Sequence, residues 1–115
     1  MEFAGGGEDN PFLRYRTLLS PYRLARSASL SDAAWGEIVE ELDAALVAVD
    51  GRSFRITPML EQKKLAAALG LKHALWVKDE TANVSGSHKA RHLMGVMLYL
   101  RVLEIAKLPD RKSVV

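Results

Sequence analysis

The sequence predicts an α/β fold, and it predicts that the elements present are the first part of a larger α/β domain. Residues 74–78 (ALWVK) form a compact apolar run between polar residues, which is typical of a buried strand. Residues 87–107 predict a long helix that is apolar on almost every side. Such a helix needs cover on most sides, and a buried strand needs neighbours on both edges. Because the chain offers few other elements to supply that cover, we expect an incomplete fold.

The composition is that of an ordinary globular domain. The chain has 115 residues, of which 49% are hydrophobic and 26% are charged. Sixteen basic and fourteen acidic side chains leave a net charge of +2, which argues against a nucleic-acid coat or a polybasic membrane anchor. Residues 71–115 carry eight basic and four acidic side chains and all three histidines. We therefore expect this last third of the chain to bind any anion.

The chain has no cysteine, which excludes disulfides, thiolate metal sites and a cysteine nucleophile. The first residues lack the basic segment and apolar stretch of a signal peptide. The longest apolar run, Leu93 to Leu100, is far shorter than the roughly 20 residues that cross a bilayer. We therefore expect a cytoplasmic protein that binds neither a membrane nor a nucleic acid.

The first half of the chain predicts a leader, an arm and a helix. Residues 1–10 are rich in glycine and acidic groups, and we expect them to be disordered. Residues 11–30 mix aromatic, leucine and arginine side chains around two prolines, which predicts an extended arm or short helical pieces. Residues 31–49 place apolar side chains at helical spacing opposite acidic ones. We expect Ser29 or Ser31 to cap that helix and Gly51 to end it.

The second half predicts alternating strands and helices. The expected elements are a short strand or extended segment at 53–57, a helix at 59–69, the buried strand at 74–78, a loop at 79–86 and the long helix at 87–107. Helix starts after strands present free N–H groups to ligands in open α/β sheets. Lys89 lies in such a first turn, where the helix dipole opposes a cation and favours a free amine. From the residues alone, Lys89 is either a reactive amine or a solvated surface lysine.

The sequence around this helix start resembles that of a known family. The segments 75–80 (LWVKDE) and 83–91 (NVSGSHKAR) closely resemble the signature of fold-type II pyridoxal-phosphate enzymes, roughly K-x-E, a short loop, then N-P-T-G-S-F-K-x-R. Thr57-Pro58 looks like the T-P-L motif of the same family, and 10–16 (NPFLRYR) looks like the arm before threonine-synthase-like domains. The family includes threonine synthase, threonine and serine dehydratases, cysteine synthase and the tryptophan synthase β subunit. Order and spacing match over about residues 53–107.

The resemblance implies a fold and a chemistry. Residues 11–109 would be the partial N-terminal domain of an enzyme with a three-layer open parallel sheet. The parent would be a homodimeric lyase of amino-acid metabolism that uses pyridoxal 5'-phosphate for β-elimination or β/γ-replacement on a small amino acid. The nearest members would be threonine synthase and threonine dehydratase, and the alternative is a replacement enzyme like cysteine synthase or tryptophan synthase β. We expect the 115-residue chain by itself to be inactive and poorly soluble.

The resemblance also implies site residues. Lys89 would hold the cofactor through a Schiff base and then move the substrate's α-proton. His88, which tryptophan synthase β subunits share at this position, and Ser87 would lie beside the cofactor. Ser85 would border the substrate carboxylate. The sequence departs from the family pattern at Val84, Ser85, His88 and Ala90, but each departure leaves the reactive amine in place.

Several residues have competing interpretations. Lys78 and Arg91 either face the cofactor phosphate, or are solvated, or pair with Asp79 or Glu80. Ser87 either caps the helix or contacts the cofactor. His88 and His92 are spaced as metal ligands are on a helix, but no third ligand is evident in the sequence, so we expect no metal site. A different class of function is a non-catalytic basic module that binds nucleic acid.

The last six residues, 110–115 (DRKSVV), predict a non-native tail. The composition changes at Pro109 from an apolar helix to a short charged segment. All six letters also match the translation of a widely used short-read sequencing adapter.

Overall fold

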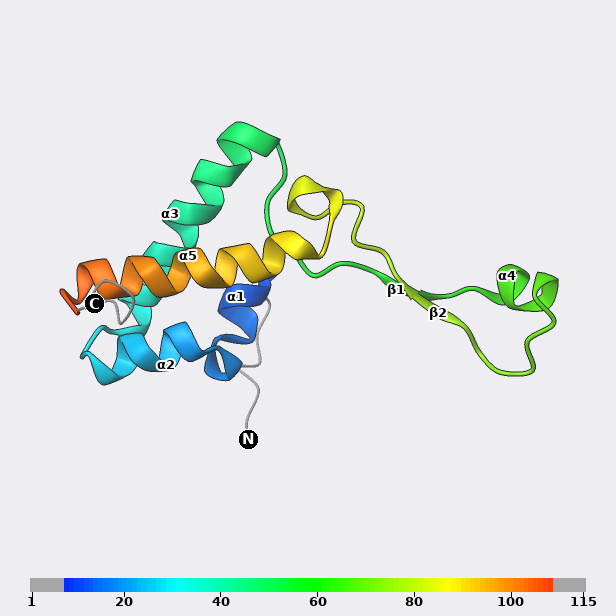
Figure 1. The fold of residues 1–115 in the computed structure, drawn as a ribbon, viewed down its shortest axis with the longest axis horizontal. Helices are drawn as coiled ribbons and strands as arrows, with labels where there is room; N and C mark the ends of the chain where they lie inside the picture. The colour runs from blue at the N-terminus through cyan, green and yellow to red at the C-terminus, as the bar shows by residue number, and fades with distance from the viewer. Residues whose placement is uncertain (1–7, 109–115) are drawn as a thin grey trace, which may run out of the picture.

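The computed structural model describes residues 8–108, which form a helical body and a projecting arm (Figure 1). The chain extends over 55 × 34 × 32 Å. The body contains α1 (Pro11–Arg14), η1 (Arg16–Leu18), α2 (Ser20–Ser27), α3 (Asp32–Asp50) and α5 (Lys89–Ile105). The projecting arm, which is a different segment from the arm predicted at residues 11–30, contains β1 (Met59–Glu61), α4 (Lys63–Ala68) and β2 (Trp76–Lys78). The short helix η2 (Val84–Gly86) lies between this arm and α5.

Residues 11–30 form short helical pieces, one of the two alternatives that the sequence left open. The Asn10 side chain accepts a hydrogen bond from the Phe12 N–H at 2.9 Å, and Pro11 occupies the first helical position, where no N–H is needed. Just before this cap, the Asp9 carbonyl accepts a bond from the Ile56 N–H at 2.9 Å. Of the predicted leader, only residues 8–10 are described. The predicted tail lies outside the described residues.

The helix predicted at 31–49 is confirmed as α3. The Ser31 hydroxyl accepts a hydrogen bond from the Ala34 N–H at 3.0 Å, so Ser31 is the cap and Ser29 is not. Gly51 ends the helix with a left-handed φ of 78°, and its N–H bonds to the Val47 carbonyl at 2.8 Å.

The core lies where α1, α2 and α3 meet α5. The Trp35 side chain is fully buried, and its indole N–H donates to the Phe12 carbonyl at 3.1 Å. The Tyr22 ring meets the Trp35 ring edge-on at 5.5 Å between centroids. The buried side chains of α5 are Ala90, Met94, Leu98, Val102 and Leu103. These fall at helical spacing, so one stripe of α5 faces the core.

Of the two alternatives predicted for 53–57, the strand is wrong, because β1 begins at Met59 and pairs antiparallel with β2. The register joins Met59 to Lys78, Leu60 to Val77 and Glu61 to Trp76. Residues 53–57 are fixed by other bonds instead. The Phe54 N–H donates to the Asp43 carboxylate at 2.8 Å, and the buried Thr57 hydroxyl donates to Glu80. The helix predicted at 59–69 is present only as α4, because its first residues belong to β1.

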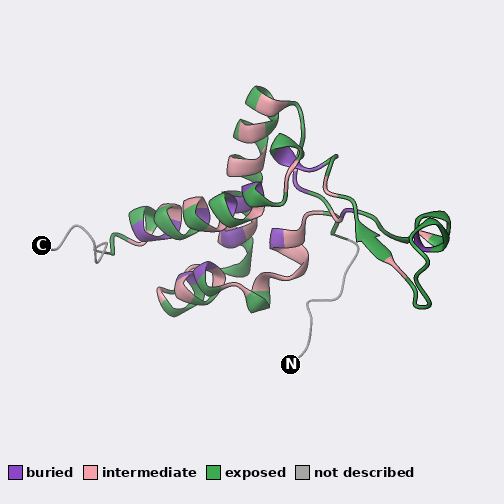
Figure 2. Cartoon of the chain, turned by 45° about the vertical axis from the view of Figure 1, so that its right-hand side comes forward, coloured by how far each residue is buried: buried purple, intermediate pink, exposed green. Residues whose placement is uncertain are grey.

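The burial predicted for the strand at 74–78 is also wrong within the described residues. The Trp76 side chain is 53% exposed, and the arm is exposed over most of its surface (Figure 2). The reason is that, in the described part of the chain, β2 has a neighbour on only one edge and all three of its residues are exposed. The predicted three-layer parallel sheet is not tested by a two-stranded sheet, and it stays a prediction.

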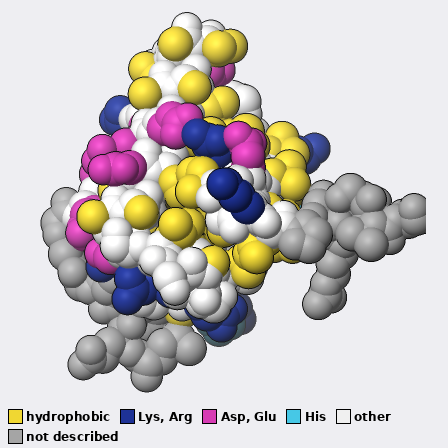
Figure 3. Space-filling model, turned by 90° about the vertical axis from the view of Figure 1, so that its left-hand side faces the viewer, with side chains coloured by type: hydrophobic (Ala, Val, Ile, Leu, Met, Phe, Trp, Pro, Cys, Tyr) yellow, Lys and Arg dark blue, Asp and Glu magenta, His cyan; other side chains and the backbone are white. Residues whose placement is uncertain are grey.

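Within the described residues, the long helix also carries apolar side chains that are largely exposed. Leu93 is 61% exposed and Leu100 is 47% exposed. Figure 3 views the end of the molecule at which α5 finishes, and hydrophobic side chains lie uncovered there among acidic and basic ones. Within residues 8–108, no helix is both long and apolar enough to span a membrane.

Candidate functional site

Four polar side chains gather where the arm joins the body, and we call Thr57, Lys78, Glu80 and Arg91 the Glu80 cluster. The Arg91 guanidinium donates from Nε to one Glu80 carboxylate oxygen at 2.7 Å and from a terminal nitrogen to the other at 3.3 Å. The same nitrogen donates to the Thr57 hydroxyl oxygen at 3.3 Å and to the Arg55 carbonyl at 3.1 Å. This two-pronged pairing gives both strength and a fixed orientation.

Lys78 completes the Glu80 cluster from β2. Its ammonium donates to the Thr57 carbonyl, which comes just before the first residues of β1. The sequence left open whether Arg91 and Lys78 face a phosphate, are solvated, or pair with Asp79 or Glu80. Arg91 pairs with Glu80, whereas Lys78 bonds to backbone. Both cations nevertheless line an open hollow of about 350 Å³, together with Glu80 and His88.

Two carboxylates at this junction have lowered pKa values. The hydrogen bond from Arg91 is the main cause of the lowered pKa of Glu80, with further contributions from the Thr57 hydroxyl and the charge of Lys78, while desolvation acts in the opposite direction. The pKa of Asp79 is lowered by bonds from the hydroxyl and the N–H of Thr81. Glu80 is therefore an anion at neutral pH.

The loop before α5 is fixed at several points. The Asn83 side chain is fully buried, and its amide nitrogen donates to the Ser87 carbonyl at 2.8 Å. The buried Oδ1 atom of Asn83 has no hydrogen-bond partner among the described residues. Ser85 and Gly86 both adopt left-handed backbone conformations, with φ of 58° and 66°. The Ser85 N–H donates to the Asp50 carboxylate at 2.9 Å, so the end of α3 holds this strained turn.

The residues predicted to contact a cofactor are consecutive at the start of α5. The Ser87 hydroxyl accepts a hydrogen bond from the Lys89 N–H at 3.2 Å, which supports the capping interpretation of Ser87. His88 occupies the position before the helix, makes no side-chain capping bond and lines the hollow of the Glu80 cluster. The Lys89 side chain is exposed, and its ammonium has no hydrogen bond or ion pair with residues 8–108.

The structure brings together only some of the predicted site residues. Ser87, His88 and Lys89 are neighbours at the helix start, but only His88 lines the hollow. Ser85 lies in the preceding turn and contacts Asp50 through its backbone. Sequence reasoning missed the roles of Asp50 and Asn83. Asp50 gave no local signal, since it bonds to a residue 35 positions away, whereas Asn83 belonged to the quoted motif without being assigned a role.

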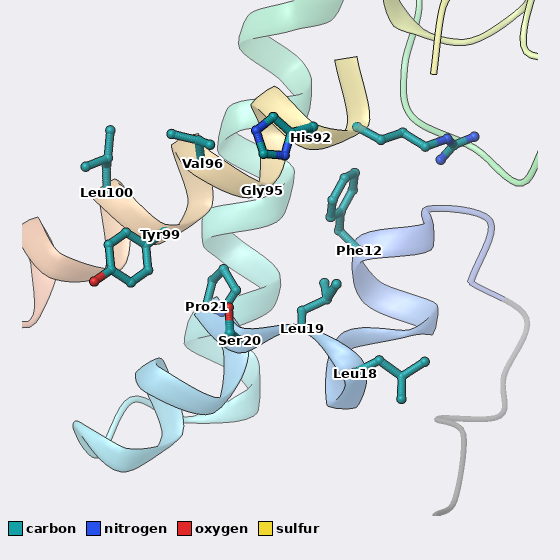
Figure 4. Close-up of a pocket in the computed structure, with 11 residues that line it drawn as sticks. Phe12, Leu18, Leu19, Ser20, Pro21, His92, Gly95, Val96, Tyr99 and Leu100 are labelled. Atoms are coloured by element: carbon teal, nitrogen blue, oxygen red, sulfur yellow. The ribbon is translucent and has the colours of Figure 1, made fainter. Parts of the chain in front are cut away.

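A larger hollow of about 580 Å³ lies between α5 and the short helices at the start of the body. Its lining is mainly apolar and comes from α5 on one side and from α1, η1 and α2 on the other (Figure 4), including Phe12, Leu18, Leu19, Pro21, Val96 and Tyr99. It contains none of the four predicted site residues, although Arg91 and His92 reach its edge. Its few polar groups offer little for a charged cofactor to bind.

Metal ligands do not gather in the described part of the chain. No group of three histidine, aspartate or glutamate side chains is close enough to hold an ion within residues 8–108. His88 and His92 therefore have no third protein ligand there.

Comparisons of the chain with protein-family models, with curated proteins and with solved structures find no match. The sequence motifs and the geometry around Lys89 therefore define the candidate site.

Proposed function

We propose that this chain carries the Schiff-base lysine of a pyridoxal-phosphate-dependent lyase that performs amino-acid β-elimination or β/γ-replacement, in the manner of threonine synthase or threonine dehydratase. The observation that carries the proposal is the placement of Lys89. It lies in the first turn of a 17-residue helix, directly after a fixed loop, and its ammonium has no partner in residues 8–108. A lysine held this way is available to react with a carbonyl group.

The surrounding residues fit an anionic cofactor. The start of α5 directs N–H groups outward, and the nearby hollow is lined by Lys78, His88 and Arg91 beside a single carboxylate. The unpartnered Oδ1 of Asn83 is a buried acceptor next to the same loop, where a further donor would satisfy it. Pyridoxal phosphate, when bound, supplies the electron sink for carbanion chemistry.

The chain's own residues have separate roles in this proposal. Lys89 would hold the cofactor, and its amine, once displaced by the substrate's amino group, would move a proton at the substrate's α-carbon. Ser87 and His88 bind near the cofactor, and Ser85 borders the substrate carboxylate. The uncovered faces of the arm and of α5 favour inactivity of the chain by itself, because a water-excluding site needs cover that residues 8–108 do not supply. The replacement chemistry of cysteine synthase or tryptophan synthase β is the alternative within the same family.

Borohydride trapping tests the proposal. The chain is incubated with pyridoxal phosphate, reduced and mapped by peptide mass spectrometry, with Lys107, near the far end of α5, as the internal comparison. We expect the pyridoxyl label on Lys89 and its loss in Lys89→Arg, while Lys107→Arg labels as the wild type does. Label on Lys78 instead, or equal label on all lysines, would contradict the assignment. Binding to DNA at two salt concentrations, without selective label, would favour the basic binding module.

A further inference from the structure

The Glu80 cluster connects three segments that are distant in the sequence. Thr57 precedes β1, Glu80 follows β2 and Arg91 lies in the first turn of α5, so its bonds span 11 to 34 residues of chain. We propose that Glu80 is a positioning residue for Lys89. By holding the Arg91 guanidinium, it fixes the first turn of α5 against the arm and thereby sets the direction of the Lys89 side chain. The proposal rests on the proposed function, in which Lys89 is the reactive amine.

The helix geometry explains why holding Arg91 orients Lys89. Two residues apart on an α-helix lie about 200° apart around its axis. Arg91 is only 26% exposed and turned toward Glu80, which itself is 14% exposed, whereas Lys89 is exposed. A rotation of the first turn that freed Arg91 would therefore also move Lys89. The bidentate guanidinium–carboxylate pair resists such a rotation better than a single contact does.

The bond from the Asn83 amide to the Ser87 carbonyl at 2.8 Å fixes the loop before α5, but fewer contacts hold the first turn itself. The His88 side chain makes no capping bond, and the Ser87 hydroxyl supplies one bond of 3.2 Å to the Lys89 N–H. Only Ala90 of the first turn is buried in the core, and the next buried residue of α5 is Met94. Ala90 is small and offers little surface to resist rotation. The hydrogen bonds of the Glu80 cluster are thus the main polar contacts between the helix start and the arm.

A matched pair of variants separates positioning from general stability. Glu80→Gln removes the carboxylate charge that Arg91 faces. Glu104→Gln removes the same charge near the other end of α5, where Glu104 accepts from Arg101 at 2.6 Å. Two measurements on the full chain need no cofactor: hydrogen exchange of the α5 amides, and the rate of acetylation of Lys89 relative to Lys107. The selectivity of pyridoxyl labelling is a third measurement.

We expect Glu80→Gln to accelerate exchange of the first-turn amides and to reduce pyridoxyl selectivity for Lys89 by about tenfold, with relative acetylation of Lys89 altered as well. Exchange at Leu98 and beyond stays as in the wild type. Glu104→Gln leaves all three measurements at Lys89 unchanged. Arg91→Lys keeps the charge but not the two-pronged geometry, and we expect an intermediate loss.

Each result has a defined meaning. If Glu80→Gln and Glu104→Gln behave alike at Lys89, the positioning role is wrong. If Glu80→Gln unfolds the chain, Arg91→Lys decides, and unchanged values in that folded variant overturn the proposal. If the wild type shows no pyridoxyl selectivity, the proposed function fails, while exchange and acetylation still decide whether Glu80 positions Lys89.

Discussion

The helical body and the arm use similar apolar side chains with opposite results. In the body, Trp35 is fully buried and bonded through its indole N–H. In the arm, Trp76 is 53% exposed on a two-stranded sheet. The difference arises because α3 is covered by α1, α2 and α5, whereas within residues 8–108 β2 pairs with β1 alone. A tryptophan in the sequence therefore indicates a need for cover, and neighbouring elements decide whether that need is met.

The two regions meet at the Glu80 cluster, so the candidate site lies at the boundary between a packed region and an uncovered one. Bonds from Arg91 cross that boundary to Glu80, Thr57 and the Arg55 carbonyl. Movement of the arm would thus be transmitted to the start of α5 rather than to its middle.

The two tryptophans give the largest expected contrast. Trp35→Ala removes a buried ring and leaves the Phe12 carbonyl without its donor, so we expect a loss of about 3–5 kcal/mol, enough to unfold a marginal domain. Trp76→Ala removes a half-exposed ring, and we expect a change below about 1 kcal/mol. Urea unfolding at low protein concentration, followed by circular dichroism, measures both. Equal losses would show that the arm is packed in solution.

The sequence predicted the body better than the arm, for a physical reason. The period of apolar residues in 31–49, the Ser31 cap and the Gly51 stop are local signals, and α3 follows them closely. The burial of 74–78 depends on partners elsewhere, and no local pattern reports whether they are present. The segment 53–57 alternates as a strand does, but Thr57 bonds to Glu80, 23 residues away, instead of joining a ladder.

The same distinction applies to the candidate site. The motif located Ser87, His88 and Lys89 because they are consecutive, and local spacing is sufficient to place them at one helix start. The motif also contained Glu80 and Arg91, yet their mutual bond was only one of several open pairings until the chain folded. The contact between Ser85 and Asp50 spans 35 residues and has no sequence signal.

Glu80 gives the next largest effect, and the size of that effect depends on pH. The pKa of Glu80 is lowered in the folded chain, so the carboxylate contributes stability above its unfolded pKa and loses that contribution as pH falls through the folded pKa. We expect Glu80→Gln to cost about 1–3 kcal/mol at pH 7, because Arg91 then lacks its charged partner. The difference from the wild type should shrink below about pH 4. Urea titrations at several pH values measure it, and a difference that grows on acidification would contradict the assigned ion pair.

The smallest effect concerns the cap of α3, inside the body. Ser31→Ala removes the hydroxyl that accepts from the Ala34 N–H, and we expect it to cost about 1 kcal/mol. Ser29→Ala is the matched control two residues earlier, where the backbone is left-handed at φ 68° and the side chain does not cap α3. Neither serine nor alanine favours that conformation, so the control should change stability by less than about 0.5 kcal/mol. Unfolding midpoints in urea compare the two variants. A larger loss for Ser29→Ala than for Ser31→Ala would place the start of α3 two residues earlier, and with it the boundary between the short helical pieces and the main helix of the body.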